Sequence, residues 1–162
     1  PGVPLGLRRT GHYRAQEMPV YVSFEGTLWR RLPFAYALPA GDSAAVRLLR
    51  LHGIAVDSLS HPWAVPVQEF VIDSVHHAER PFQGHHETSL AGRWRDASTT
   101  LPPGTWIVRT GQPLGVVAFY LLEPETDDGL VTWNLFDGSL AVGSPFAVRR
   151  IAVPVRGLNE AR

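Results

Sequence analysis

The sequence predicts an α+β domain whose main element is an antiparallel β-sheet. Several segments alternate β-branched or aromatic residues with polar ones, the period of two expected of half-buried strands. Helical periodicity occurs in two places, near residues 42–52 and near residues 113–122. The order strand, helix, several strands, helix, strand has too few alternations for a doubly wound parallel sheet. We therefore expect strands that pair mostly through hairpins.

Length and composition indicate one folded domain. The 162 residues are 44% hydrophobic and 19% charged, which is ordinary for a globular protein. We interpret residues 1–17, rich in Gly, Pro and Arg, as a linker or lead-in segment, and residues 18–162 as a single α+β domain. The 15 basic and 15 acidic residues cancel, so the sequence predicts no nucleic-acid partner. No apolar run approaches the roughly 20 residues of a membrane helix, so we expect no membrane insertion.

The first strand is predicted from Met18 to Trp29, where Val20, Val22 and Phe24 alternate with polar residues. Residues 34–38 follow as an extended segment that Pro33 and Pro39 restrict to a sheet edge or to irregular structure.

A short amphipathic helix is predicted near residues 42–52. Asp42 or Ser43 can cap its first turn, and Gly53 is placed to end it. Residues 54–59 and 63–78 return to strand composition, with a break expected at Pro66.

Residues 63–78 and 86–95 predict a long β-hairpin around the turn Pro-Phe-Gln-Gly at 81–84. A short strand follows the LPPG turn, at residues 105–110. Residues 113–122 have apolar residues at helical spacing and predict a buried helix, although this apolar run also fits a core strand. The last predicted element is an edge strand at residues 146–155.

Four of the seven histidines lie in VHHAERPFQGHHE, residues 75–87, and form the candidate metal site. His76 and Glu79 have the H-x-x-E spacing of some zinc peptidases, but a zinc site also needs a third ligand, and no histidine follows His86. Adjacent residues on a strand point to opposite faces, so a metal could be held only by residues facing each other across the hairpin. A turn centred near Pro81 would pair His77 with His85 and His76 with His86. We expect no metal at this hairpin, and these four histidines are the weak candidates.

Other chemistry-bearing residues have structural interpretations. The acidic stretch EPETDDG, residues 123–129, lacks the spacing of a calcium loop and is interpreted as a solvated turn. No Cys is present, and neither a nucleophile elbow nor a phosphate loop occurs. The five tryptophans could line a sugar or peptide groove, but core packing is the favoured interpretation. The residues themselves predict no catalytic group, and they leave any substrate-binding residues and the cellular compartment unknown.

Three segments resemble a known family: YALPAGDSAAVRLLRLHGI (36–54), ERPFQGHHE (79–87) and LPPGTWIVRTGQPLGVVAFYLLEPETDDGLVTWNLFD (101–137). Together they resemble the region that follows the catalytic domain in large bacterial zinc carboxypeptidases of the M14 family, over most of residues 18–140. The resemblance implies a parent enzyme that removes C-terminal residues from peptides. It also implies zinc in that parent, bound by H-x-x-E and a distant His, with a substrate-binding Arg and a general-base Glu.

Those catalytic motifs belong to the preceding domain of the family, and none is carried over to this chain. The resemblance therefore implies a non-catalytic accessory domain that packs on its catalytic domain or restricts access to it. Its partners would be that catalytic domain in the same polypeptide and the peptide substrate. The alternatives are a peptide- or glycan-binding module that uses exposed aromatics and, least favoured, a stand-alone metal-dependent hydrolase using the cluster from His76 to His86.

Overall fold

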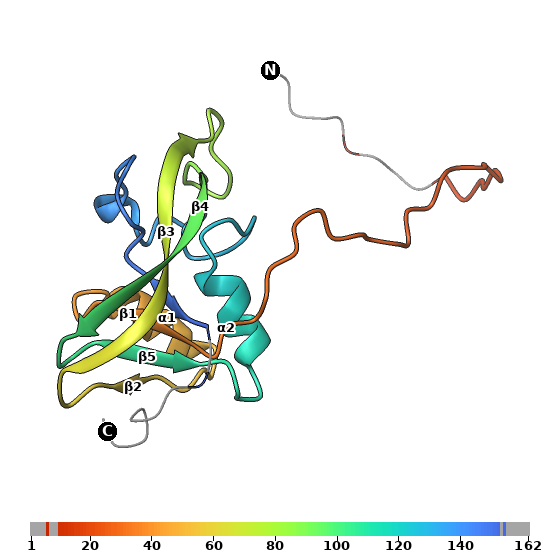
Figure 1. Cartoon of the computed structure of the whole chain (residues 1–162). Coiled ribbons are helices and arrows are strands. Elements are labelled where there is room, and N and C mark those ends of the chain that lie inside the picture. The colour runs from red at the N-terminus through yellow and green to blue at the C-terminus, as the bar shows by residue number, and fades with distance from the viewer. Residues whose placement is uncertain (1–5, 7–9, 153, 155–162) are drawn as a thin grey trace. The chain divides into compact units, whose positions relative to one another are not determined.

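The computed structural model describes residue 6, residues 10–152 and residue 154. The chain divides into two units, residues 1–30 and residues 31–162 (Figure 1). In the first unit, residues 10–30 form neither helix nor strand, and the side chain of Phe24 is 95% exposed. The strand predicted from Met18 to Trp29 is therefore wrong, because an alternating pattern forms a strand only where a partner backbone pairs with it. The predicted lead-in lies partly outside the described residues, at 1–5 and 7–9.

The second unit contains an antiparallel sheet and two α-helices, as predicted. The sheet order is β2-β5-β1-β6-β3-β4, and every pair is antiparallel. The strands are β1 (Ala35–Leu38), β2 (Asp57–Ser58), β3 (Trp63–His77), β4 (Thr88–Leu101), β5 (Trp106–Arg109) and β6 (Arg149–Ile151). The helices are α1 (Ser43–Leu51) and α2 (Gly115–Leu122), followed by a 3-10 turn, η1 (Asp137–Ser139).

Both predicted helices are confirmed. Helix α1 buries Ala45, Val46 and Leu49 along one side, as an amphipathic helix must. It ends at Leu51 and is capped by His52, and the next residue, Gly53, has a φ of +82°, the left-handed conformation that favours glycine after a helix. Asp42 is the N-terminal cap residue, but its side chain makes no capping hydrogen bond. The apolar run at 115–122 is a helix, which settles the choice between helix and core strand.

Two strands occupy positions that the sequence did not predict. The segment expected at a sheet edge, β1, lies between β5 and β6 with all four residues buried. The final strand, β6, was also expected at an edge but lies between β1 and β3. Strand β1 is only four residues long, so Pro33 and Pro39 on either side of it fall outside the paired backbone and remove no hydrogen bond from the sheet.

The long hairpin of β3 and β4 is confirmed. The break expected at Pro66 is wrong, because β3 runs through this residue and pairs it with Ser98. Strand β3 pairs with β6 at Gln68 and not at Pro66. Although the backbone nitrogen of Pro66 has no hydrogen to donate, it therefore interrupts no hydrogen bond between β3 and β6. A bulge at Asp73 shifts the register between Ile72 and Ser74. Figure 1 shows the end of this hairpin extending away from the short strands.

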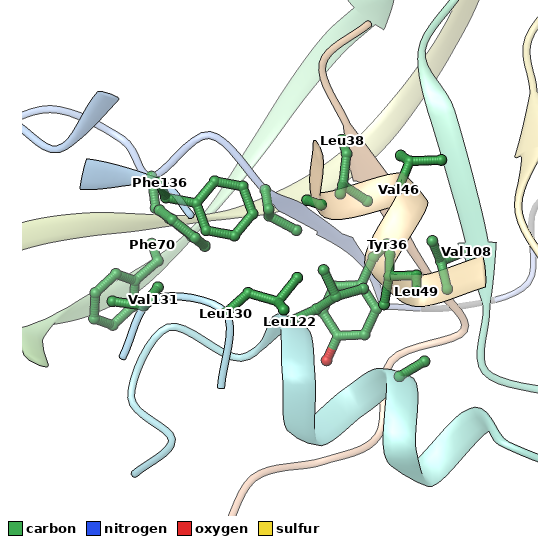
Figure 2. Packing of buried hydrophobic residues seen from close by; sticks show 14 of the residues in the cluster. Tyr36, Leu38, Val46, Leu49, Phe70, Val108, Leu122, Leu130, Val131 and Phe136 are labelled. Atoms are coloured by element: carbon green, nitrogen blue, oxygen red, sulfur yellow. The ribbon is translucent and has the colours of Figure 1, made fainter. Parts of the chain in front are cut away.

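Alternation along the strands gives the sheet an apolar core on each face. Tyr36 and Leu38 point into the larger core together with α1, α2 and the 130–148 segment (Figure 2). Ala35 and Ala37 point into the second core, where the first half of β3 supplies Trp63. The strongly twisted hairpin therefore contributes to both faces of the sheet.

Candidate functional site

The histidine-rich end of the hairpin is built differently from the predicted turn. Strand pairing ends at His77, opposite Thr88, while His76 lies opposite Ser89. The connection then forms a second, tighter turn in which Phe82 and His85 exchange two backbone hydrogen bonds. Gln83 and Gly84 occupy its centre with φ of +49° and +90°, the signature of a type I′ turn. The predicted pairings of His77 with His85 and of His76 with His86 are therefore wrong.

Three of the four candidate histidines have separate hydrogen-bond partners. The Nδ1 atom of His77 lies 2.9 Å from Oγ1 of Thr88. His85 Nδ1 lies 2.7 Å from Oδ1 of Asn134, and His86 Nδ1 donates to the carbonyl oxygen of Ala78 at 2.7 Å. His76 is the second-to-last residue of β3, and it is exposed. Among the described residues, no group of three or more His, Cys, Asp or Glu side chains is placed to hold a metal.

Asn134 is the centre of a polar network at this end of the hairpin. Its φ of +64° is a left-handed conformation that Asn adopts more readily than most residues. Its amide nitrogen lies 2.9 Å from the carbonyl of His86, from Oγ1 of Thr88 and from Oδ2 of Asp137. Thr88 donates in turn to Oδ1 of Asp137 at 3.1 Å. We call His77, His85, Thr88, Asn134 and Asp137 the hairpin-end network.

The hairpin-end network connects two segments that are far apart in sequence. It ties the hairpin to the 129–137 segment, and the ring of His85 also stacks on Trp133 with ring centres 4.4 Å apart. Trp133 is 38% exposed, and its indole N–H donates to Oδ1 of Asp128 at 2.6 Å. The polar side chains of the network hydrogen-bond to one another, except that Nε2 of His85 is buried without a hydrogen-bond partner. The arrangement holds a loop and presents one aromatic ring to solvent.

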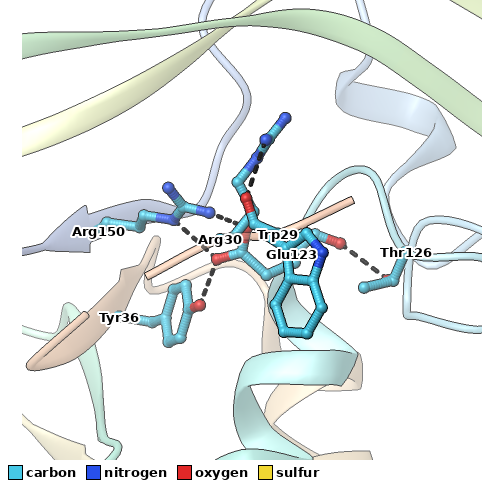
Figure 3. Close-up of polar contacts among 6 residues, drawn as sticks. All are labelled: Trp29, Arg30, Tyr36, Glu123, Thr126 and Arg150. Atoms are coloured by element: carbon cyan, nitrogen blue, oxygen red, sulfur yellow. Dashed lines mark hydrogen bonds and ion pairs between the residues drawn. The ribbon is translucent and has the colours of Figure 1, made fainter. Parts of the chain in front are cut away.

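A second polar cluster is buried under the sheet, and Figure 3 shows it. Arg150 of β6 donates from Nε to Oε1 of Glu123 at 2.7 Å, and its second nitrogen bonds the other carboxylate oxygen. The hydroxyl of Tyr36 also donates to Oε1. The guanidinium of Arg150 lies 3.5 Å from the ring centre of Trp94, a cation–π contact. We call Tyr36, Glu123 and Arg150 the buried triad.

Within the buried triad, Glu123 and Arg150 form a structural ion pair. Glu123 is 2% exposed and Arg150 is 5% exposed, so each charge depends on the other for compensation. Burial, with a further contribution from the Glu123 charge, raises the pKa of Tyr36 above its ordinary value. The phenol therefore stays protonated and donates. With three donors on its carboxylate and almost no access to solvent, Glu123 cannot serve a substrate as a general base.

Glu69 forms a third charged cluster on β3. Arg95 donates to its Oε2 at 2.8 Å, and Arg149 donates to its Oε1 at 3.1 Å. The hydrogen bond from Arg95, followed by the contributions of Arg149, lowers the pKa of this carboxyl despite the opposing effect of burial. Glu69 is thus held ionised between two guanidinium groups that join β3 to β4 and β6.

Sequence analysis missed both buried carboxylates. It placed Glu123 in a solvated acidic turn, whereas the residue directly follows the apolar helix α2 and points inward. A carboxylate next to such a run is the signal that could have marked it. Its partner, Arg150, comes from a strand 27 positions later, and no local pattern links them.

The tryptophans mostly support the packing interpretation. Trp63 is in the second core, while Trp94 and Trp106 pack against the larger one. Trp133 is the most exposed of the four tryptophans in the second unit, and it lies at the hairpin end. The four therefore do not line one groove.

Comparison with known proteins relates the chain to carboxypeptidases. It is 30% identical over 111 residues to carboxypeptidase 2 of Trichophyton rubrum, covering 68% of this chain and 21% of that protein. It is 26% identical over 127 residues to carboxypeptidase 2 of Trichophyton tonsurans, covering 78% and 23%. A probable carboxypeptidase 2 of Arthroderma benhamiae is 29% identical over 104 residues, covering 64% and 20%.

Most of the chain is therefore homologous to a segment of these fungal proteins, and it spans about a fifth of their length. These relatives are fungal, whereas the family resemblance described above is to bacterial proteins. No family model matches the chain, and no solved structure matches it. In the described part of the chain, neither helix is long and apolar enough to cross a membrane.

Proposed function

We propose that this chain is a non-catalytic accessory domain of a zinc carboxypeptidase-like protein of the M14 family. The observation that carries the proposal is the homology to a segment about a fifth as long as carboxypeptidase 2. In this proposal the zinc, the catalytic groups and the peptide-binding cleft belong to the catalytic domain of the same polypeptide. The chain would pack on that domain or restrict access to its cleft.

The described geometry supports a framework role. A zinc peptidase site needs three protein ligands, one open position and a nearby general base. Here the buried carboxylates of Glu69 and Glu123 are each held by arginine. The histidines of the hairpin end bond to a threonine, an amide and a backbone carbonyl. These polar groups hold strands and loops together, which is what a rigid accessory domain requires.

Helix α2 offers the surface that would contact the catalytic domain. It is apolar nearly all round, and Val116, Val117 and Tyr120 remain exposed on its outer side, Val116 at 70%. An apolar group of this kind on a domain surface is typical of a contact with another domain. The occupant that we propose is the catalytic domain, because about four-fifths of the homologous carboxypeptidase chain lies outside the segment that matches this one.

Substitutions on α2 in the longer protein test the proposal. Val116→Asp should loosen the contact and speed proteolytic cleavage between the domains, because a charge would be desolvated there. Val142→Asp, at another apolar side chain of similar exposure, 66%, is the matched control and should change nothing. Equal behaviour of the two variants would contradict the proposed surface. Loss of peptidase activity on changing His76 or Glu79 to Ala would contradict the non-catalytic role itself.

A peptide- or glycan-binding module is the second candidate function. The observation that favours it is Trp133, held by its stack on His85 and left 38% exposed, with the exposed Phe82 in the same tight turn as His85. An oriented indole is a suitable platform for a sugar ring or an apolar side chain. Titration with oligosaccharides and peptides should then quench tryptophan fluorescence in the native chain and leave Trp133→Ala unchanged. Unchanged fluorescence in both proteins would exclude this module.

A further inference from the structure

A pocket of about 440 Å³ lies between helix α1 and strand β5, and none of its lining residues belongs to the hairpin-end network or the buried triad. It is lined by Ser43, Val46, Arg47, Arg50, Leu51 and Trp106. The volume falls within the range of small-molecule sites. The lining combines an apolar wall, made by the indole and two aliphatic side chains, with two guanidinium groups. None of the six lining residues is acidic.

The two arginines differ in how they are held. Arg50 lies over the ring of Trp106, 5.2 Å from its centre, and donates to the carbonyl of Val56 at 3.3 Å. The indole is itself fixed by its N–H, which donates to the carbonyl of Ala40 at 3.2 Å. Arg47 lies one turn earlier on α1, so both cations face the same side of the helix. In the described part of the chain, Arg47 makes no hydrogen bond or ion pair.

We propose that this pocket binds the C-terminal residue of a peptide through its free carboxylate and its apolar side chain. The carboxylate accepts hydrogen bonds from Arg47 and Arg50, and the side chain packs on Trp106, Val46 and Leu51. Pairing a guanidinium with a carboxylate gives shorter and stronger hydrogen bonds than neutral groups do. The proposal rests on the proposed function and deepens it, since peptides with free C-termini are what a carboxypeptidase acts on.

The same electrostatics distinguish a peptide from a free amino acid. A free amino acid carries an ammonium group next to its carboxylate, and that group would lie close to two guanidinium charges with no acidic residue in the lining to compensate it. A peptide has a neutral amide at this position. The pocket therefore favours a peptide end over the released product.

The binding test uses the 162-residue chain and three probes that share a phenylalanine side chain. N-acetyl-Ala-Phe with a free carboxylate should shift the NMR signal of the Trp106 indole N–H, assigned by its loss in Trp106→Phe. The corresponding C-terminal amide and free phenylalanine should bind at least about tenfold more weakly, which corresponds to losing one charge-assisted contact. Arg47→Gln should lower the affinity for the acid about fivefold, while Arg80→Gln, an exposed arginine in the hairpin connection, should leave it unchanged.

Equal binding of acid and amide, no binding of the acid, or equal affinities of Arg47→Gln and Arg80→Gln would overturn the proposal. Free phenylalanine binding as tightly as the peptide acid would overturn the assignment to a peptide end. None of these results touches the accessory role, which is decided by peptidase activity rather than by ligand binding. Peptidase activity in this chain alone would overturn the accessory role and leave the binding result as it stands.

Discussion

Glu123→Gln is the substitution that tests the buried triad most sharply. It keeps the shape and one acceptor oxygen but removes the negative charge that compensates Arg150. The arginine is 5% exposed and sits on the ring of Trp94, so it cannot reach water without moving β6. Breaking a buried ion pair by neutralising one partner costs about 3–5 kcal/mol because the other charge stays buried. We expect a loss of unfolding free energy in that range.

The matched control is Asp73→Asn, which neutralises a carboxylate paired with Arg93 on the exposed side of the same sheet. Both side chains of that pair are more than 40% exposed, and such pairs contribute below about 1 kcal/mol. In urea unfolding followed by tryptophan fluorescence, a loss of about 3 kcal/mol lowers the midpoint by roughly 1–3 M, given slopes of about 1–3 kcal/mol/M.

Removing both charges separates desolvation from loss of packing. Glu123→Leu with Arg150→Met should be less destabilising than Glu123→Gln alone, since neither partner then remains as an uncompensated buried charge. A midpoint for Glu123→Gln equal to that of Asp73→Asn would refute the reasoning that the triad is a buried, mutually dependent pair.

Three further variants test separate parts of the fold. Gly92→Ala should lose about 1–3 kcal/mol of unfolding free energy in urea, because a Cβ at this position would lie 2.2 Å from the carbonyl oxygen of Val71. The control Gly41→Ala, with open space around the added Cβ, should lose little. Equal urea midpoints for the two variants would contradict the close approach at Gly92. Glu69→Gln should flatten the pH dependence of stability below about pH 4.5. The lowered pKa of Glu69 in the folded protein gives stability that is complete above the ordinary pKa of 4.5 and is lost as the pH falls through the folded pKa. Parallel curves of unfolding free energy against pH for the two proteins would contradict this effect. Asn134→Ala should speed hydrogen exchange in the turn at 82–85 more than Asn134→Gly does. Both variants lose the side-chain hydrogen bonds of the network, but glycine adopts the left-handed backbone conformation more readily than alanine. Identical exchange rates would show that this backbone conformation contributes nothing.

Local patterns predicted the parts of the fold that local interactions determine. The helices at 43–51 and 115–122 and the β3–β4 hairpin follow from periodicity, a glycine after the helix and a turn sequence. The expected first strand fails because Val20, Val22 and Phe24 have the right alternation but no partner strand. The central positions of β1 and β6 could not be predicted, since sheet order depends on pairings between residues 35–38 and 149–151 that no local pattern encodes.

The candidate site shows the same division. The sequence predicted a hairpin connection at the histidine-rich stretch, but the small turn inside it places His85 opposite Phe82 and away from His77. The partners that fix this end, Asn134 and Asp137, are more than 40 positions away along the chain. The absence of a metal there stays a prediction, to be checked by titrating the chain with zinc and following the histidine ring signals.

Peptidase activity of the purified 162-residue chain is the most direct test of the central claim. The chain would be incubated with zinc and N-blocked dipeptides, and release of the C-terminal residue would be measured beside the longer protein. The accessory role predicts release by the longer protein and none by this chain. Release by the chain alone, abolished by His76→Ala or Glu79→Ala, would contradict it and place the catalytic chemistry in the histidine-rich hairpin.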